Sequence, residues 1–349
     1  MILKNKIVIL LLVLLSSACT NTDKPAGKPE PMAVPEVQLE LKFMRFEKEL
    51  FSKGEKIDSN VVNSLRQQYG DFFEIWLTRL SGVLAPMQVN APSGLVASNL
   101  YQYTNDHYIK QVYHDCDSAF NDLSTLERQT TDAFKRYKVL FPKAAIPKLL
   151  TYTSPFTSNV MAMDSTLGIG LHFYLGEQYK YYPSIGLPQY MIRRFDSAYM
   201  LKDLLYGWMD SEFVNDSNDL NCLSQMIYQG KLLYLTETLA PQIPDTILSG
   251  YSAVQLKWTA ENEYRVWTFL VENQLLYNTN SKQYIKFVND GKTTNGFPPE
   301  APAKLGVYIG WQIVRSFMKN NPDISPVELM QLHNAQVLLS GSGYKPRLK

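Results

Sequence analysis

The residues whose types could do chemistry together lie in the stretch AYMLKDLLYGWMD, residues 198–210. Residues three and four positions apart share one face of an α-helix, so Lys202, Asp203 and Tyr206 form a common polar edge. The other side carries an apolar stripe, which predicts packing against a core: Leu201, Leu204, Leu205 and Trp208. The sequence leaves three interpretations of the polar edge open: an active site, the remnant of an active site, or a helix face in solvent.

The polar edge has the spacing of a zinc-peptidase helix but the wrong side chains for one. In the motif H-E-x-x-H, two histidines four residues apart bind the metal and the glutamate acts as the base. Lys202 and Tyr206 occupy the two ligand positions, and Asp203 occupies the acidic one. Downstream, Gln229 precedes Gly230 where a gluzincin-type enzyme carries the Glu-Gly pair of its third ligand. An ammonium group repels zinc and a neutral amide cannot replace the carboxylate, so we expect no metal, no cofactor and no catalytic residue.

Other catalytic or metal-binding patterns are missing from the sequence. The histidines have none of the spacings that metal sites use: His107, His114, His172 and His333. The nucleophile motif G-x-S-x-G and the phosphate-binding P-loop do not occur. Two further interpretations stay open. One is an active hydrolase whose groups converge from separate segments, Asp203, Tyr206, Glu261 and Glu263; the other is a glycan or small-molecule binder that uses the aromatic stretch 172–183.

The elements that must position these residues are mostly helices. Apolar periodicity predicts helices over 59–80, 98–114, 123–140, 196–213, 219–239, 251–272, 281–289, 303–319 and 325–340. Short apolar runs between turn-forming residues predict strands at 147–153, 158–163 and 167–172. This layout predicts an α+β fold dominated by helix, in which a small β-meander packs with helices. No linker interrupts residues 39–349, so we expect one domain there.

The loop at 289–302 is long and rich in turn-forming residues, and loops of this length are often functional. It leads into the helix expected at 303–319. There Gly306 and Gly310 are four residues apart, so we expect another element to pack closely against that face.

The first residues resemble a bacterial export signal. Lys4 and Lys6 precede an apolar run, residues 7–15, which is too short to span a membrane and is followed by small residues up to Cys19. We therefore expect a lipoprotein signal peptide over 1–18, with Cys19 lipidated as the first mature residue; plain secretion after Ala18 is the alternative. Four prolines predict that residues 19–38 form an extended tether between the membrane and the body.

Composition limits the partners and the redox chemistry. The 34 basic and 33 acidic residues leave a net charge of +1 with no long basic run, so we expect no nucleic-acid partner. Beyond Cys19 the chain has two cysteines, Cys116 and Cys222, which could pair in an exported protein or stay buried and free.

The chain resembles the gliding-motility lipoprotein family called GldB over essentially its whole length. The segments that carry the resemblance are FMRFEKELF (43–51), YGDFFEIWL (69–77), LGIGLHFYLG (167–176), MIYQGKLLY (226–234), ENEYRVWTFLVENQLLY (261–277) and NGFPPEAPAKLGVYIGWQIV (295–314). The family is similar in layout to zincin-like peptidases, which carry H-E-x-x-H on the equivalent helix. The resemblance implies a membrane-anchored cell-envelope protein, with its body in the periplasm, that works with the gliding or an allied secretion machinery.

Together these observations predict a non-catalytic, degenerate-peptidase-like binding or scaffold protein, in effect a pseudoenzyme with a zincin (gluzincin)-like fold. The surface expected to bind is a cleft between the helix at 196–213 and the loop at 289–302. Its candidate residues are Lys202, Asp203, Tyr206 and Gln229. The expected partners are the membrane, through the lipid on Cys19, and other envelope proteins of the machinery.

Overall fold

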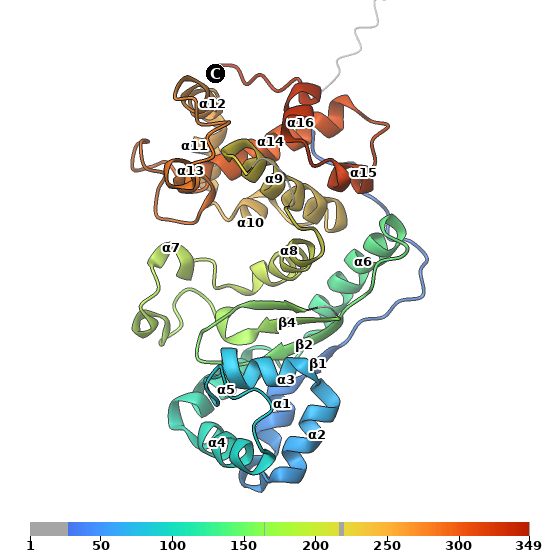
Figure 1. The fold of residues 1–349 in the computed structure, drawn as a ribbon, viewed down its shortest axis with the longest axis vertical. Coiled ribbons are helices and arrows are strands. Elements are labelled where there is room, and N and C mark those ends of the chain that lie inside the picture. Colours follow the sequence, from blue (N-terminus) through green and yellow to red (C-terminus); the bar gives the residue numbers. More distant parts are fainter. Residues whose placement is uncertain (1–26, 164, 216–219, 349) are drawn as a thin grey trace, which may run out of the picture.

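The computed structural model describes residues 27–163, 165–215 and 220–348. A four-stranded sheet lies in the middle of the molecule, with one group of helices below it and a larger group above (Figure 1). Its strands are β1 (Phe43–Arg45), β2 (Lys148–Tyr152), β3 (Val160–Met163) and β4 (Thr166–Gly170). The expected α+β class, dominated by helix, is therefore confirmed.

The expected β-meander is wrong. The strand order is β1-β2-β4-β3, with β1 parallel to β2, β2 parallel to β4, and only β3 antiparallel to its neighbour β4. The chain passes from β2 to the outer strand β3 and returns to insert β4 beside β2. The physical reason is that β2 is covered on both faces, which is typical of parallel strands. Leu149 packs into the core on one side of the sheet and Leu150 into the core on the other.

The helices below the sheet are shorter than predicted because two residues interrupt them. The helix expected at 59–80 divides at Gly70, whose φ of +52° an L-residue rarely adopts. The helix expected at 98–114 divides at Asp106, whose carboxylate caps the next helix. The resulting elements are α1 (Phe46–Ser52), α2 (Ser59–Tyr69), α3 (Asp71–Ile75), a π-helical turn (Trp76–Leu80), α4 (Ser93–Asn105) and α5 (His107–Ala119). Helix α6 (Ser124–Leu140) has nearly its predicted length and runs above the sheet, where it contacts α8 and α9 (Figure 1).

The helices above the sheet follow the predicted positions more closely. The stretch expected as one helix at 251–272 breaks at Asn262, and that at 325–340 breaks before Asn334, which caps the following helix. The elements are α7 (Gln189–Ile192), α8 (Met200–Glu212), α9 (Cys222–Leu239), α10 (Asp245–Ser249), α11 (Ala253–Glu261), α12 (Glu263–Glu272), α13 (Ser281–Val288), α14 (Leu305–Asn320), α15 (Pro326–Gln331) and α16 (Ala335–Ser342).

Helices α9 and α14 cross in close contact at glycines. A Cβ atom on Gly230 of α9 would lie 2.5 Å from the carbonyl carbon of Gly310, and one on Gly310 would collide with the carbonyl oxygen of Met226. Gly306 lies similarly close to the backbone of Phe287 in α13. The prediction that another element packs closely against Gly306 and Gly310 is therefore confirmed. This contact fixes the position of α14, whose N-terminus borders the site described below.

A buried ion cluster joins α9, α10 and α14 to the N-terminal segment. Arg315 contacts both carboxylate oxygens of Glu237, at 2.5 and 3.1 Å, and lies 3.0 Å from Asp245. Lys28 reaches the same two acids, at 3.5 and 3.3 Å. Of the tether expected over 19–38, residues 19–26 lie outside the described residues. Residues 27–38 contain no helix or strand, and Lys28 holds their start against the body.

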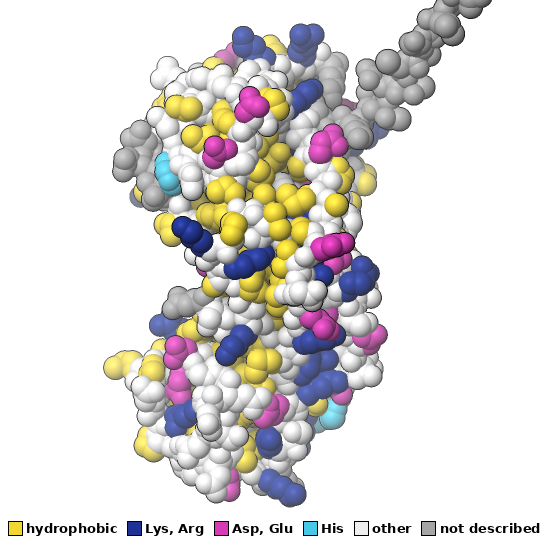
Figure 2. All heavy atoms as spheres, turned by 90° about the vertical axis from the view of Figure 1, so that its right-hand side faces the viewer, with side chains coloured by type: hydrophobic (Ala, Val, Ile, Leu, Met, Phe, Trp, Pro, Cys, Tyr) yellow, Lys and Arg dark blue, Asp and Glu magenta, His cyan; other side chains and the backbone are white. Residues whose placement is uncertain are grey.

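The remaining sequence expectations concern cysteines and membrane spans. Cys116 in α5 and Cys222 in α9 are buried and free, so they do not form a disulfide. Of the helices that the structure describes, none has both the length and the hydrophobicity that a membrane-spanning segment needs. The signal peptide expected over 1–18 and the lipidation site Cys19 lie outside the described part of the chain. Seen from the side, the molecule narrows at about the height of α8, and charges of both signs are interspersed on that face (Figure 2).

Candidate functional site

A cavity of about 350 Å³ lies between α8, α9 and the N-terminus of α14. The loop 156–159 and the segment 187–199 form its other walls. Its volume falls in the range of about 300–1,000 Å³ that is typical of small-ligand sites. Because the walls come from segments far apart in the sequence, the cavity exists only in the folded chain.

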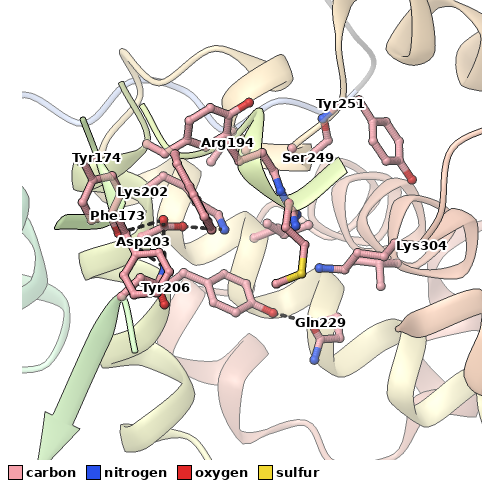
Figure 3. A pocket seen from close by; sticks show the side chains of 18 of the residues that line it. Phe173, Tyr174, Arg194, Lys202, Asp203, Tyr206, Gln229, Ser249, Tyr251 and Lys304 are labelled. Carbon is pink, nitrogen blue, oxygen red and sulfur yellow. Dashed lines mark hydrogen bonds and ion pairs between the residues drawn. The ribbon is translucent and has the colours of Figure 1, made fainter. Parts of the chain in front are cut away.

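All four residues singled out from the sequence line this cavity. Lys202, Asp203 and Tyr206 project from α8, and Gln229 projects from the facing helix α9 (Figure 3). The side chains of Lys202 and Asp203 are 19% and 18% exposed. The apolar stripe of α8 packs into the core, as predicted. The polar edge of α8 is therefore the wall of a cavity and not a face in open solvent.

The carboxylate of Asp203 is held by three donors. Lys202 Nζ lies 3.2 Å from Oδ1, while Tyr174 Oη donates to Oδ2 at 3.0 Å and Asn159 Nδ2 donates at 3.3 Å. Burial, and after it the negative charge of Asp203, raises the pKa of Tyr174 well above its usual range, so its hydroxyl keeps the proton that it donates. These contacts hold the carboxylate in place and occupy three of the roughly four acceptor positions that a carboxylate has.

Tyr206 and Gln229 form a second polar pair across the cavity. Tyr206 Oη donates a hydrogen bond to Gln229 Oε1, which joins α8 to α9. The ammonium group of Lys202 lies 4.7 Å from the centre of the Tyr206 ring, a cation–π distance. Burial raises the pKa of Tyr206, so this hydroxyl is neutral at physiological pH. The pair offers a ligand polar but uncharged groups.

Two further cations line the cavity that the sequence reasoning missed, Arg194 and Lys304. Arg194 comes from the segment after α7, and its guanidinium pairs with Asp290 of the loop 289–302. Lys304 is the residue directly before α14. A signal for Lys304 was present in the sequence, because a lysine at a helix N-terminus faces the positive end of the helix dipole and replaces the usual capping residue.

Lys304 has no hydrogen-bond or ion-pair partner for its ammonium group among the residues that the structure describes. The side chain is mostly buried. Burial, and after it the positive charge of Lys202, lowers the pKa of Lys304 to about 8. Its φ of +61° also lies in the left-handed region, where a residue with a Cβ is strained. Lys304 therefore combines an unbalanced charge with an unfavourable backbone conformation.

The rest of the cavity wall is largely aromatic and aliphatic. Trp311 and Tyr308 come from α14, and the segment 187–199 contributes further apolar side chains. The aromatic and aliphatic residues are Phe156, Phe173, Tyr174, Leu187, Met191, Phe195, Tyr199, Leu233, Leu248, Tyr251, Val307, Tyr308 and Trp311. The site can thus hold an apolar group in contact with a few fixed polar and cationic groups.

A second cavity of about 530 Å³ adjoins the first and is bordered by the loop 289–302. The two share Arg194, Ser249, Gly250, Tyr251 and Lys304 in their walls. The helix and the loop that were expected to border one cleft therefore line adjoining cavities, with Lys304 at the junction.

The residues of the two alternative sites are not brought together in this way. Glu261 and Glu263 do not line the cavity with Asp203; Glu263 accepts a hydrogen bond of 2.7 Å from Tyr344, and Glu261 faces solvent beside Lys257. Within the described ranges, no group of three or more His, Cys, Asp or Glu side chains could hold a metal ion.

The aromatic stretch 172–183 is divided between cavity and core. Phe173 and Tyr174 line the cavity, whereas Tyr182 is buried and donates to the carbonyl of His172 at 2.9 Å. His172 is fully buried 3.1 Å from Ser154 Oγ, and burial lowers its pKa to about 3. This serine–histidine contact has no access from solvent, so it does not form a nucleophilic site.

The comparison with protein families is decisive for the identity of the chain. A family model described as gliding motility protein GldB matches residues 27–346. The chain belongs to the GldB family. The resemblance found in the sequence segments is therefore confirmed, and the family's designation associates it with gliding motility and with lipoproteins.

No curated protein and no solved structure matched the chain. The zincin-like layout expected from the sequence thus stays a prediction for this GldB-family protein. The positions of Lys202, Tyr206 and Gln229 around one cavity are independent of that comparison, because they are read from the structure itself.

Proposed function

We propose that this GldB-family protein is a lipid-anchored, non-catalytic component of the cell envelope that serves the gliding or an allied secretion machinery. It acts by binding a protein or peptide segment in the cavity between α8, α9 and α14. The family designation supports the motility role, and the export signal with Cys19 supports the anchor. We place the folded body in the periplasm.

The observation that carries the binding role is the mutual pairing of the polar groups in the cavity. A general base needs an acceptor atom that the substrate can reach and a pKa near the operating pH, and the carboxylate of Asp203 is already contacted by three donors of the protein. Tyr206 likewise donates its hydroxyl proton to Gln229 Oε1. The groups that remain available to a ligand are aromatic faces and one cation, and these suit recognition.

The test of catalysis uses the mature protein that begins at Cys19. We expect no stoichiometric zinc in the purified protein and no hydrolysis of a random peptide library with added zinc. The matched variant is Asp203→Asn, with Asp210→Asn as an exposed acid on the same helix. Tightly bound zinc at one equivalent, or turnover that Asp203→Asn abolishes and Asp210→Asn preserves, would overturn the non-catalytic assignment.

The test of the anchor and of the partner uses cells. Cys19→Ser should release the protein from the membrane fraction, and retention of a processed Cys19→Ser protein there would contradict lipidation. Cross-linking in the envelope, with a photoreactive residue at Gln229, should capture another envelope protein. The same probe at Val254 on exposed α11 is the control, and equal products from both sites would contradict binding in the cavity.

A further inference from the structure

The charges around the cavity are not balanced. Three cations and one acid line it: Arg194, Lys202, Lys304 and Asp203. Asp203 pairs with Lys202 and Asp290 pairs with Arg194, so each of these cations has a carboxylate beside it. Lys304 has no such partner in the described part of the chain. One positive charge is therefore left for a ligand to neutralise.

The position of Lys304 makes this charge accessible to a ligand in the cavity. Figure 3 shows its side chain reaching from α14 into the space between Arg194 and the Tyr206–Gln229 pair. Helix α14 is 16 residues long, has no acidic residue in its first turn and begins beside Lys304. Its positive dipole end adds to the attraction for an anion. The helix dipole and the charge of Lys304 thus both attract an anion to this end of the cavity.

Lys304 is unfavourable for the free protein in two ways, in its charge and in its backbone conformation, and this indicates a role in ligand binding. An unpaired charge in a mostly buried position is unfavourable in the free protein, and a side chain at φ +61° is strained. A glycine would avoid both costs. Residues that break local rules without compensation inside the fold are expected at functional sites.

The side chains that line the cavity indicate which kind of anionic ligand fits. Tyr251, Tyr308, Trp311, Met191 and Leu187 line the cavity together with Lys304. Only one cation is unbalanced, which fits a group with one negative charge. A phosphate with two charges would leave the second one without a counter-ion. The chemistry that fits is a carboxylate attached directly to an aromatic or aliphatic group.

We propose that the cavity binds the free C-terminal carboxylate of a peptide that ends in an aromatic or aliphatic residue, with Lys304 as the counter-ion. The inference rests on the proposed function, since it names the part of the partner that enters the cavity. The apolar side chain lies against Tyr251, Tyr308 and Trp311. The preceding residues extend past Arg194 into the adjoining cavity beside the loop 289–302.

The experiment measures binding of four probes to the mature protein by the fluorescence of its tryptophans, one of which, Trp311, lines the cavity. The probes are acetyl-Gly-Gly-Phe with a free carboxylate, the same peptide with a C-terminal amide, acetyl-Phe alone, and inorganic phosphate. We expect the free-acid peptide to bind at least tenfold more tightly than its amide. Acetyl-Phe should bind more weakly than the peptide, and phosphate more weakly still.

The matched variants are Lys304→Met and Lys319→Met, the second being an exposed lysine in the last turn of α14, away from both cavities. Lys304→Met should lower the affinity for the free-acid peptide at least tenfold without changing the affinity for the amide, and Lys319→Met should change neither. A folding defect is separated from lost binding because Lys304→Met is expected to be the more stable protein, as worked out below.

The outcomes separate the two proposals. Equal affinity for acid and amide, or full affinity in Lys304→Met, overturns the carboxylate site but leaves the protein-binding role. If phosphate binds most tightly of the four probes, the assignment of the ligand as a carboxylate is wrong. If acetyl-Phe binds as tightly as the peptide, the ligand is a small carboxylic acid and not the C-terminus of a peptide. Turnover of the peptide, or specific binding with no envelope partner captured at Gln229, overturns the proposed function instead.

Discussion

Replacement of Lys304 by methionine should make the free protein more stable at neutral pH. Methionine keeps the length of the side chain and its contacts with the aromatic wall but removes the charge. In the wild type the ammonium group is mostly buried, with no partner among the described residues. Removal of this charge is thus expected to stabilise the fold. Charges that serve a function often lower the stability of the protein that carries them.

The magnitude follows from the pKa of the lysine. Burial and the neighbouring Lys202 lower it from 10.5 to about 8. Each pKa unit corresponds to about 1.36 kcal/mol of differential free energy, so the shift sets an upper limit of about 3 kcal/mol. Water at the open side of the cavity screens part of the charge, and a gain of about 1–3 kcal/mol is therefore expected.

The assay is urea unfolding of the wild type and Lys304→Met at several pH values. The folded state loses the Lys304 proton at about pH 8 and the unfolded chain at about 10.5, so the unfolded chain binds more protons between these values. Wild-type stability rises with pH in that window. The advantage of Lys304→Met should be complete below pH 8 and shrink steadily towards pH 10.

The control is Lys202→Met, the other lysine of the cavity. It leaves the carboxylate of Asp203 without its cation, so it should destabilise the protein by about 1–2 kcal/mol, less than for a fully buried pair. The two substitutions are chemically identical and should have opposite signs. A destabilised Lys304→Met protein, or a gain that does not depend on pH, would refute the reasoning that Lys304 is an unbalanced charge.

Three further predictions concern packing and buried charge. Gly310→Ala should lower the free energy of unfolding by more than about 3 kcal/mol in urea titrations, whereas Gly94→Ala in α4, with only one atom within 4 Å at 3.8 Å, should be neutral or stabilising. Arg315→Met should cost about 3–5 kcal/mol in the same assay because it leaves the buried carboxylate of Glu237 with only Lys28, whose Nζ is 3.5 Å away; an unchanged midpoint would contradict this. The pKa of His172 is about 3 in the folded protein, against 6.5 for an ordinary histidine. The unfolded chain therefore binds more protons between these pH values, and the wild type should lose stability relative to His172→Gln as the pH falls from 6.5 towards 3. Parallel stability profiles of the two proteins would contradict the lowered pKa of His172.

The strands and most helices could be predicted from the sequence, but the pairing of the strands could not. Short apolar runs between turn-forming residues marked β2, β3 and β4 at nearly their true positions. Strands of three to five residues carry little information on register. β1 pairs with β2 across about a hundred residues of intervening helix, and nothing local in either segment specifies that partner.

Part of the candidate site could likewise be predicted from the sequence and part could not. The polar edge of α8 was visible from spacing alone, because Lys202, Asp203 and Tyr206 lie within one helix. Arg194 and Lys304 could not be assigned to the same cavity, since the segment after α7 and the start of α14 meet α8 only in the folded chain. Local sequence could show that Lys304 is unusual for a helix start, but its missing counter-ion is a property of the tertiary structure.

The contact of Lys28 with Glu237 and Asp245 determines how far the protein can move from its membrane. With the proposed lipid on Cys19, the number of residues between Cys19 and Lys28 sets an upper limit of about 30 Å on the distance between them. Arg315 belongs to the same ion cluster as Lys28. Lys304, directly before α14, is eleven residues from Arg315, which corresponds to about 16 Å along the helix axis. The opening for the ligand would then stand within about 45 Å of the bilayer. With the proposed anchor, the site would therefore meet partners at or near the membrane that holds the lipid.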